Sequence, residues 1–101
     1  MILSVGDITS LSPEELLKAV KVSGNITGNH QDDTLIFYID EAKEYLKSAG
    51  VETAVIDSTL AKGCISRGVF DLWMASGGEA KFSEAFYQRA EQLRRIEVKS
   101  E

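Results

Sequence analysis

The sequence has very little of the residue types on which covalent and metal chemistry depends: its 101 residues include one cysteine, one histidine and one proline. The single cysteine, Cys64, has no second thiol for a disulfide within the chain, which is typical of cytosolic proteins. One histidine does not complete a typical zinc-binding set. These absences exclude a disulfide-stapled scaffold and argue against a zinc centre.

Long hydrophobic runs are also absent. The longest unbroken apolar run covers residues 35–39, much shorter than the ~20 residues that a membrane-spanning helix needs. Residues 1–7 have neither the basic start nor the apolar stretch of a secretory signal. We therefore expect an intracellular protein without a membrane segment.

Basic residues are in the minority, with 11 Lys and Arg against 16 Asp and Glu and a formal net charge of -5. Proteins that bind nucleic acid tightly without sequence preference cluster basic residues to neutralise phosphates. The acidic balance argues against that class, although it does not exclude a protein that works beside DNA. The 44% of hydrophobic residues is enough for a modest core, and we expect one domain spanning residues 1–101.

Two helices are predicted in the first half of the chain. Ser12 followed by Pro13 and Glu15 has the pattern of a capping box with proline in the first turn, so a helix should run from there to about Val22. A loop rich in glycine and asparagine follows. A second helix is predicted from Asp32 or Asp33, whose carboxylates favour the positive end of the helix dipole, to a cap at Gly50; its apolar stripe comprises Leu35, Ile39, Ala42, Leu46 and Ala49.

The third predicted helix is the most informative element, because it is too apolar for its size. It should begin with Ser58 as its cap and stop at residues 76–78. Its apolar stripe comprises Ala61, Ile65, Gly68, Leu72 and Ala75, and further apolar residues outside the stripe are Val69, Phe70, Trp73 and Met74. Such a helix is either the central one of the fold or is covered in part by a neighbouring subunit.

A fourth helix is predicted from about Phe82, with Phe86, Ala90 and Leu93 on one side, and residues 97–101 are expected to fray. No segment has the sustained alternation of a half-buried strand, although a short extended piece at residues 80–82 or 51–55 stays open. The sequence therefore predicts an all-α fold, a small bundle of about four helices. The expected core includes Leu17, Leu35, Ile39, Leu46, Ile65, Leu72 and Trp73.

Two glycines inside the third helix require a physical reason, because each costs about 1 kcal/mol relative to alanine. We expect another helix to approach closely at Gly63 and Gly68. The pair Gly77 and Gly78 lacks the spacing and the lysine of a phosphate-binding loop, so it is interpreted as a hinge or turn.

His30, Asp32 and Asp33 form the only sequence cluster that suggests metal or acid–base chemistry. The simpler interpretation is a polar loop followed by a helix that the two aspartates cap. Cys64 as a nucleophile would need a basic partner brought to it by the fold, whereas a cysteine on an apolar helix usually packs. We expect no catalytic residue, no metal and no cofactor.

A helix-turn-helix is an alternative for the second and third helices, because the third carries Lys62, Ser66 and Arg67. The connection from Gly50 to Ser58 is longer than the tight turn of that motif. The candidate recognition helix also carries large apolar residues where base-contacting polar side chains would be needed. The sequence does not favour this motif.

The order of elements resembles the small head-tail connector proteins of tailed bacteriophages, also called head-completion, adaptor or DNA-packaging proteins. The resemblance covers residues 8–93. It rests on a short capped first helix, a loop ending in Asp32-Asp33-x-Leu35-Ile36, a helix of the type Ile39-x-x-Ala42-x-x-Tyr45-Leu46, and a third helix closing with Trp73.

The resemblance implies a subunit without catalytic residues that forms a ring between the portal protein and the next neck or tail component, in the virion neck and, during assembly, in the host cytoplasm. DNA would pass through the ring without specific binding. The alternative is a small intracellular helical regulatory or DNA-binding domain. For the connector, the expected subunit interface comprises Phe70, Trp73, Met74, Phe82, Phe86 and Tyr87.

Overall fold

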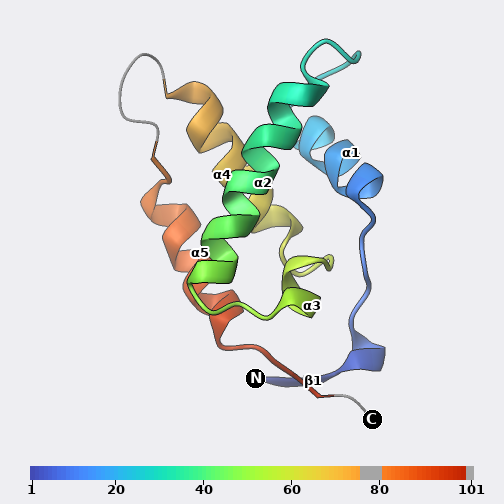
Figure 1. Ribbon diagram of the computed structural model, residues 1–101, viewed down its shortest axis with the longest axis vertical. Helices are drawn as coiled ribbons and strands as arrows, with labels where there is room; N and C mark the ends of the chain where they lie inside the picture. Colours follow the sequence, from blue (N-terminus) through green and yellow to red (C-terminus); the bar gives the residue numbers. More distant parts are fainter. Residues whose placement is uncertain (76–80, 100–101) are drawn as a thin grey trace.

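One helix, α4 (Lys62–Met74), packs against three others in the computed structural model, which describes residues 1–75 and 81–99 (Figure 1). These three are α1 (Pro13–Ser23), α2 (Asp32–Ser48) and α5 (Glu84–Arg94). The shorter elements are β1 (Ile2–Ser4), a 3-10 turn (Val5–Asp7), α3 (Thr53–Ile56) and β2 (Glu97–Lys99).

The central position of α4 explains why its sequence is so apolar. Its buried residues are Cys64, Ile65, Ser66, Gly68, Val69 and Leu72, which point to more than one side of the helix. The sequence left open whether this helix is central to the fold or covered by a neighbouring subunit. For these buried residues the helix is central, because other helices of the same chain cover them.

Helix α1 begins as the sequence predicts. The Ser12 hydroxyl accepts a hydrogen bond from the Glu15 amide at 3.1 Å, and the Glu15 carboxylate accepts one from the Ser12 amide at 2.8 Å. Pro13 occupies the first helical position, where its missing amide hydrogen costs nothing. The capping box is therefore confirmed, and the helix ends one residue after the predicted Val22.

Helix α2 has the predicted ends but not the predicted cap. It starts at Asp32, yet its N-cap residue is Gln31 and no side chain there accepts a hydrogen bond from the first turn. At the other end Gly50 has a φ of 95°, a left-handed conformation that favours glycine. The amides of Gly50 and Val51 donate to the carbonyls of Lys47 and Leu46, the pattern of a Schellman motif.

The prediction that Ser58 caps the third helix is wrong. Helix α4 begins four residues later, and α3 occupies part of the segment expected to be a link. Ser58 is completely buried; its hydroxyl donates to the Val55 carbonyl at 2.7 Å and accepts from the Leu60 amide at 3.1 Å. The residue closes the turn after α3, since both hydrogen bonds of its side chain are to residues that precede α4. The formation of α3 also excludes an extended piece at residues 51–55.

Two short strands correct the all-α prediction. Strands β1 and β2 pair in parallel, with Ile2, Leu3 and Ser4 opposite Glu97, Val98 and Lys99. They bring the two ends of the chain together (Figure 1). The amide of Glu97 donates to the Met1 carbonyl at 2.8 Å. Residues 97–99 are therefore paired rather than frayed. Residues 76–80 and 100–101 lie outside the described part of the chain. The predictions about Gly77, Gly78 and the end of the third helix fall on these residues.

The core contains most of the predicted residues. Leu35, Ile39, Leu46, Ile65 and Leu72 are buried, while Leu17 and Trp73 are only partly buried and pack against the cluster. Helix α5 begins at Glu84, two residues after the predicted start, and contributes Phe86, Ala90 and Leu93. The fold is thus mainly helical, and the four predicted helices occur in the predicted order. The structure adds one short helix, α3, and a small two-stranded sheet.

Candidate interaction surface

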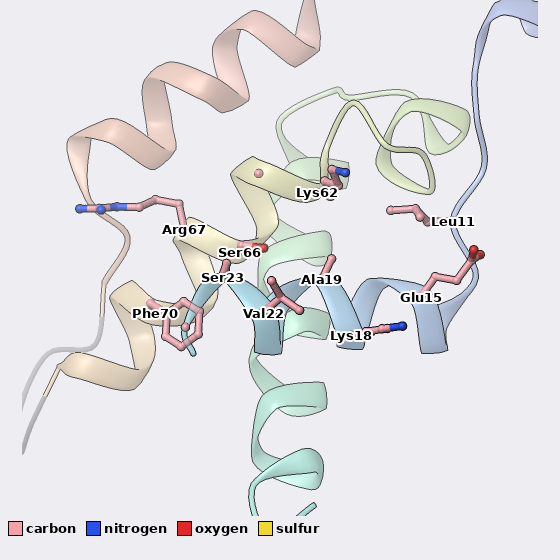
Figure 2. A pocket seen from close by; sticks show the side chains of 12 residues that line it. Leu11, Glu15, Lys18, Ala19, Val22, Ser23, Lys62, Ser66, Arg67 and Phe70 are labelled. Carbon is pink, nitrogen blue, oxygen red and sulfur yellow. The ribbon is translucent and has the colours of Figure 1, made fainter. Parts of the chain in front are cut away.

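An open groove of about 940 Å³ runs between α1 and α4 (Figure 2). Its apolar part is formed by Leu11, Ala19, Val22 and Phe70. The Val22 side chain is 73% exposed, although it lies on the helix next to the core. A volume of this size is at the upper end of the usual range for ligand pockets, which is roughly 300–1,000 Å³.

Phe70 is fixed at one end of the groove by the backbone of α1. A Cβ atom placed on Gly24 would lie 2.2 Å from the Phe70 Cζ atom, so only glycine lets the ring lie there. Phe70 also contacts Trp73, with ring centroids 6.3 Å apart, and Trp73 contacts Tyr38 at 6.4 Å. The groove therefore ends at an aromatic cluster that ties α1, α2 and α4 together.

Basic residues line the edges of the groove. Lys18 extends from α1, whereas Lys62 and Arg67 extend from α4 (Figure 2). Arg67 is held by Asp71, with Nε 3.3 Å from Oδ1. Among residues 1–75 and 81–99, neither lysine has an ion-pair partner. Glu15, the one carboxylate of the lining, is occupied by Ser12, whose amide hydrogen bond lowers the pKa of that carboxyl.

The predicted interface residues divide into three groups. Met74 and Tyr87 are exposed, at 75% and 39%. Phe70, Trp73 and Phe82 are half-buried and pack against the core of their own chain. The sixth residue, Phe86, is completely buried.

Phe86 is therefore not surface in the isolated subunit. Its ring stacks on Phe82 with centroids 4.0 Å apart and lies 5.4 Å from that of Tyr45. Gly68 of α4 lies beneath it, and a Cβ there would be 2.6 Å from the Phe86 Cε1 atom. The inclusion of Phe86 in the interface needs correction, because its apolar area is used to dock α5 on α4 and α2. The close approach expected at Gly68 is confirmed, whereas at Gly63 the nearest atom is the Nη2 of Arg89 at 3.5 Å.

The polar cluster in the sequence is not assembled into a centre. His30 is exposed, and Asp32 forms an ion pair with Lys21 at 2.8 Å. Asp33 is exposed near the start of α2. In the described part of the chain, no group of three His, Cys, Asp or Glu side chains is placed to hold a metal ion.

Cys64 is buried between α4 and α5, and its Sγ lies 3.7 Å from the Phe86 carbonyl oxygen. Burial raises the pKa of the thiol to about 11, an effect that Arg89 opposes and Asp71 reinforces. At neutral pH the thiol is therefore protonated. Because the thiolate is the reactive form, Cys64 acts here as a buried packing residue.

Sequence reasoning missed Val22 and Lys18 as surface features. From the sequence, Val22 marks only the approximate end of the first predicted helix, and no role at the surface is predicted for it. The groove arises because α1 crosses α4 without covering its full length, a property of two segments some forty residues apart. Periodicity within one helix carries no signal for it.

The placement of α4 bears on the DNA-binding alternative. A recognition helix must present one free face to the major groove. Helix α4 contacts α1, α2 and α5, and its exposed Lys62 and Arg67 lie at the edge of a groove already flanked by α1 (Figure 2). This geometry does not favour a helix-turn-helix.

Comparisons with protein-family models, with curated proteins and with solved structures found no match to the chain. Within residues 1–75 and 81–99, no helix has the length and apolar character needed to cross a membrane.

Proposed function

We propose that this chain is a structural protein of a tailed bacteriophage or prophage, which forms an oligomeric ring between portal and tail components and extends the DNA channel at head completion. The observation that carries the proposal is the open groove between α1 and α4, which leaves Val22 and part of Phe70 without cover from the same chain. Apolar surface of this kind marks an interaction site.

Two further properties support a ring subunit. The helical order is the one on which the resemblance to head-tail connectors rests. The net charge of -5 suits the wall of a channel through which DNA must slide, because fixed negative charge repels phosphates. The partners are other copies of the chain, the portal protein and the next neck or tail component, and the sites of action are the virion neck and the host cytoplasm during assembly.

Deletion of the gene from the producing phage or prophage tests the proposal. We expect particles whose heads fail to join tails, seen by electron microscopy, and recovery of tailed particles when the wild-type gene is supplied. Val22→Asp should fail to restore them, because it introduces a charge into the groove. Val5→Asp is the matched control, since Val5 is also exposed, at 50%, but lies outside the groove. Normal tailed particles from the deletion strain would contradict the proposal.

A further inference from the structure

The outer face of α2 carries apolar and acidic side chains together. Ile36 and Phe37 are 43% and 52% exposed, although they belong to a helix whose other side forms the core. On the same outer face lie four exposed carboxylates, those of Asp33, Asp40, Glu41 and Glu44, and one exposed lysine, Lys47, so the face is acidic on balance. None of the four has an ion-pair partner within the described ranges.

The groove between α1 and α4 has the complementary character. Its apolar lining includes Val22 and Phe70, and its edges carry Lys18 and Lys62, which also lack ion-pair partners in the described part of the chain. An apolar centre with charged edges is the usual composition of an interface. One surface thus offers exposed apolar side chains among mostly acidic groups, and the other offers an apolar groove whose edges are mostly basic, with Glu15 as its one carboxylate.

The two surfaces lie on opposite faces of the molecule. In Figure 1, α2 passes in front of α4. In Figure 2, which looks onto the groove, α2 lies behind α1 and α4. One chain therefore cannot bring the two surfaces together, but two chains can. A contact between different patches on two copies is heterologous, and repetition of it closes into a ring when the rotation allows.

We propose that the outer face of α2 of one copy docks in the α1/α4 groove of the next copy. The inference rests on the proposed function and names the contact by which the ring forms. Symmetric contacts are disfavoured by charge: groove against groove would oppose lysines, and α2 against α2 would oppose carboxylates. Like charges brought together at an interface weaken it strongly, whereas opposite charges fix its register.

Charge reversal on each surface separately and then on both tests this contact. The groove variant is Lys18→Glu with Lys62→Glu, the face variant is Asp40→Lys with Glu44→Lys, and a third chain combines all four changes. All four residues are exposed, so the fold should survive, as circular dichroism can check. The matched control is Lys81→Glu with Lys99→Glu, which changes the net charge as the groove variant does, at exposed positions outside both surfaces.

Each single-surface variant should weaken self-association by about tenfold or more in sedimentation equilibrium at low salt. It should also fail to restore tailed particles to the deletion strain. The combined variant should recover both properties, because the charges are again opposite, and the control should behave as wild type. Equal association of the face variant and wild type, or no recovery in the combined variant, would overturn the contact.

The result also separates this contact from the proposed function. If deletion prevents the joining of heads and tails but both single-surface variants restore it fully, the connector role stands and the α2-to-groove contact is wrong. If deletion has no effect on the particles, the connector role is wrong, and sedimentation of the purified variants alone decides whether the contact exists. A wild-type chain that stays monomeric in that case would also overturn it.

Discussion

Gly68 and Gly63 belong to the same helix, yet an aromatic ring lies against only one of them. A Cβ at Gly68 would come within 2.6 Å and 2.8 Å of two Phe86 ring atoms, whereas a Cβ at Gly63 would meet only the Arg89 guanidinium at 3.5 Å. The Phe86 ring is fully buried and cannot move aside freely. Sequence alone gives both glycines the same cost in helix propensity, so only packing distinguishes them.

We predict that alanine has opposite effects at these two positions. Gly68→Ala should lower the free energy of unfolding by about 1–3 kcal/mol, because overpacking outweighs the gain in helix propensity. Gly63→Ala should raise it by up to ~1 kcal/mol, since the site is exposed and the contact is ordinary. Urea denaturation of the two variants measures both. Stabilisation by both substitutions would show that α5 does not lie against Gly68.

Because Cys64 is buried, its thiol makes the stability of the folded protein depend on pH in the alkaline range. In the folded chain burial raises the pKa of its thiol to about 11, from 9.0 for an accessible thiol. Between these values the unfolded chain loses the proton and the folded chain keeps it, so deprotonation favours unfolding. The contribution of the thiol to stability is therefore complete below pH 9 and is lost as the pH rises to about 11.

The expected loss across this interval is roughly 2 kcal/mol of the free energy of unfolding. Lysines and tyrosines titrate in the same range, so the measurement is the difference between wild type and Cys64→Ala at each pH. The difference should shrink steadily from pH 9 to pH 11. A constant difference would mean that the thiol is accessible to water in the folded protein.

At the scale of elements, α5 is attached to α4 by a polar contact at its first turn. Ser83 donates to the Asp71 carboxylate from its amide at 2.9 Å and from its hydroxyl at 2.7 Å. The same hydroxyl accepts from the Phe86 amide at 3.3 Å and thereby caps α5. The Asp71 side chain is only 10% exposed, so its hydrogen bonds are shielded from water.

Asp71→Ala should therefore destabilise the chain by about 1–3 kcal/mol, since it leaves the Ser83 amide without its acceptor. Amide exchange should increase first at the start of α5. Asp57→Ala is the matched control: Asp57 forms a 3.5 Å ion pair with Lys43 and its side chain is 52% exposed, so its loss should cost less than about 1 kcal/mol. Equal losses in the two variants would contradict a special role for Asp71.

Elements whose start and stop signals are local could be predicted from the sequence. The capping box at Ser12 and the glycine cap at Gly50 each act within a few residues, and both were predicted correctly. Ser58 is a residue type that often caps helices, but its hydroxyl bonds to Val55 and Leu60 in the turn before α4. The strands could not be predicted, because each has three residues and pairs with a segment at the other end of the chain.

The candidate surface was predictable only in part, for a similar reason. The sequence shows an excess of apolar residues on the third helix, and Met74 at the end of that helix is exposed. Tyr87, on the last helix, is exposed as well. How the helices cross determines which large apolar side chains are buried inside the chain and which stay exposed. Phe86 was predicted to be exposed at the interface, but it is buried. Val22 and Phe37 lie away from the buried sides of their helices, so helical periodicity agrees with their exposure; the groove beside Val22 depends on how α1 crosses α4, which neither helix shows alone.

At the scale of the whole molecule, much of the positive charge is neutralised within the chain. Lys21 pairs with Asp32, Lys43 with Asp57, and Arg67 with Asp71. Arg94 and Arg95 both pair with Glu91. A protein that binds duplex DNA needs several free cations on one face to displace counterions from phosphates. The groove offers Lys18 and Lys62, but they lie beside an apolar hollow suited to a protein partner.

We therefore predict no measurable complex with random duplex DNA at physiological salt, and no sequence-specific complex. A channel wall with a net charge of -5 should repel the duplex, whereas a regulator would bind with an affinity that falls steeply as salt rises. Titration of labelled duplex at two salt concentrations measures this, with Lys62→Ala plus Arg67→Ala as the test variant and Lys81→Ala plus Lys99→Ala as its control. Sub-micromolar, salt-sensitive binding that only the first variant loses would favour the DNA-binding alternative, and the connector role would then stand only if neck assembly also failed without the protein.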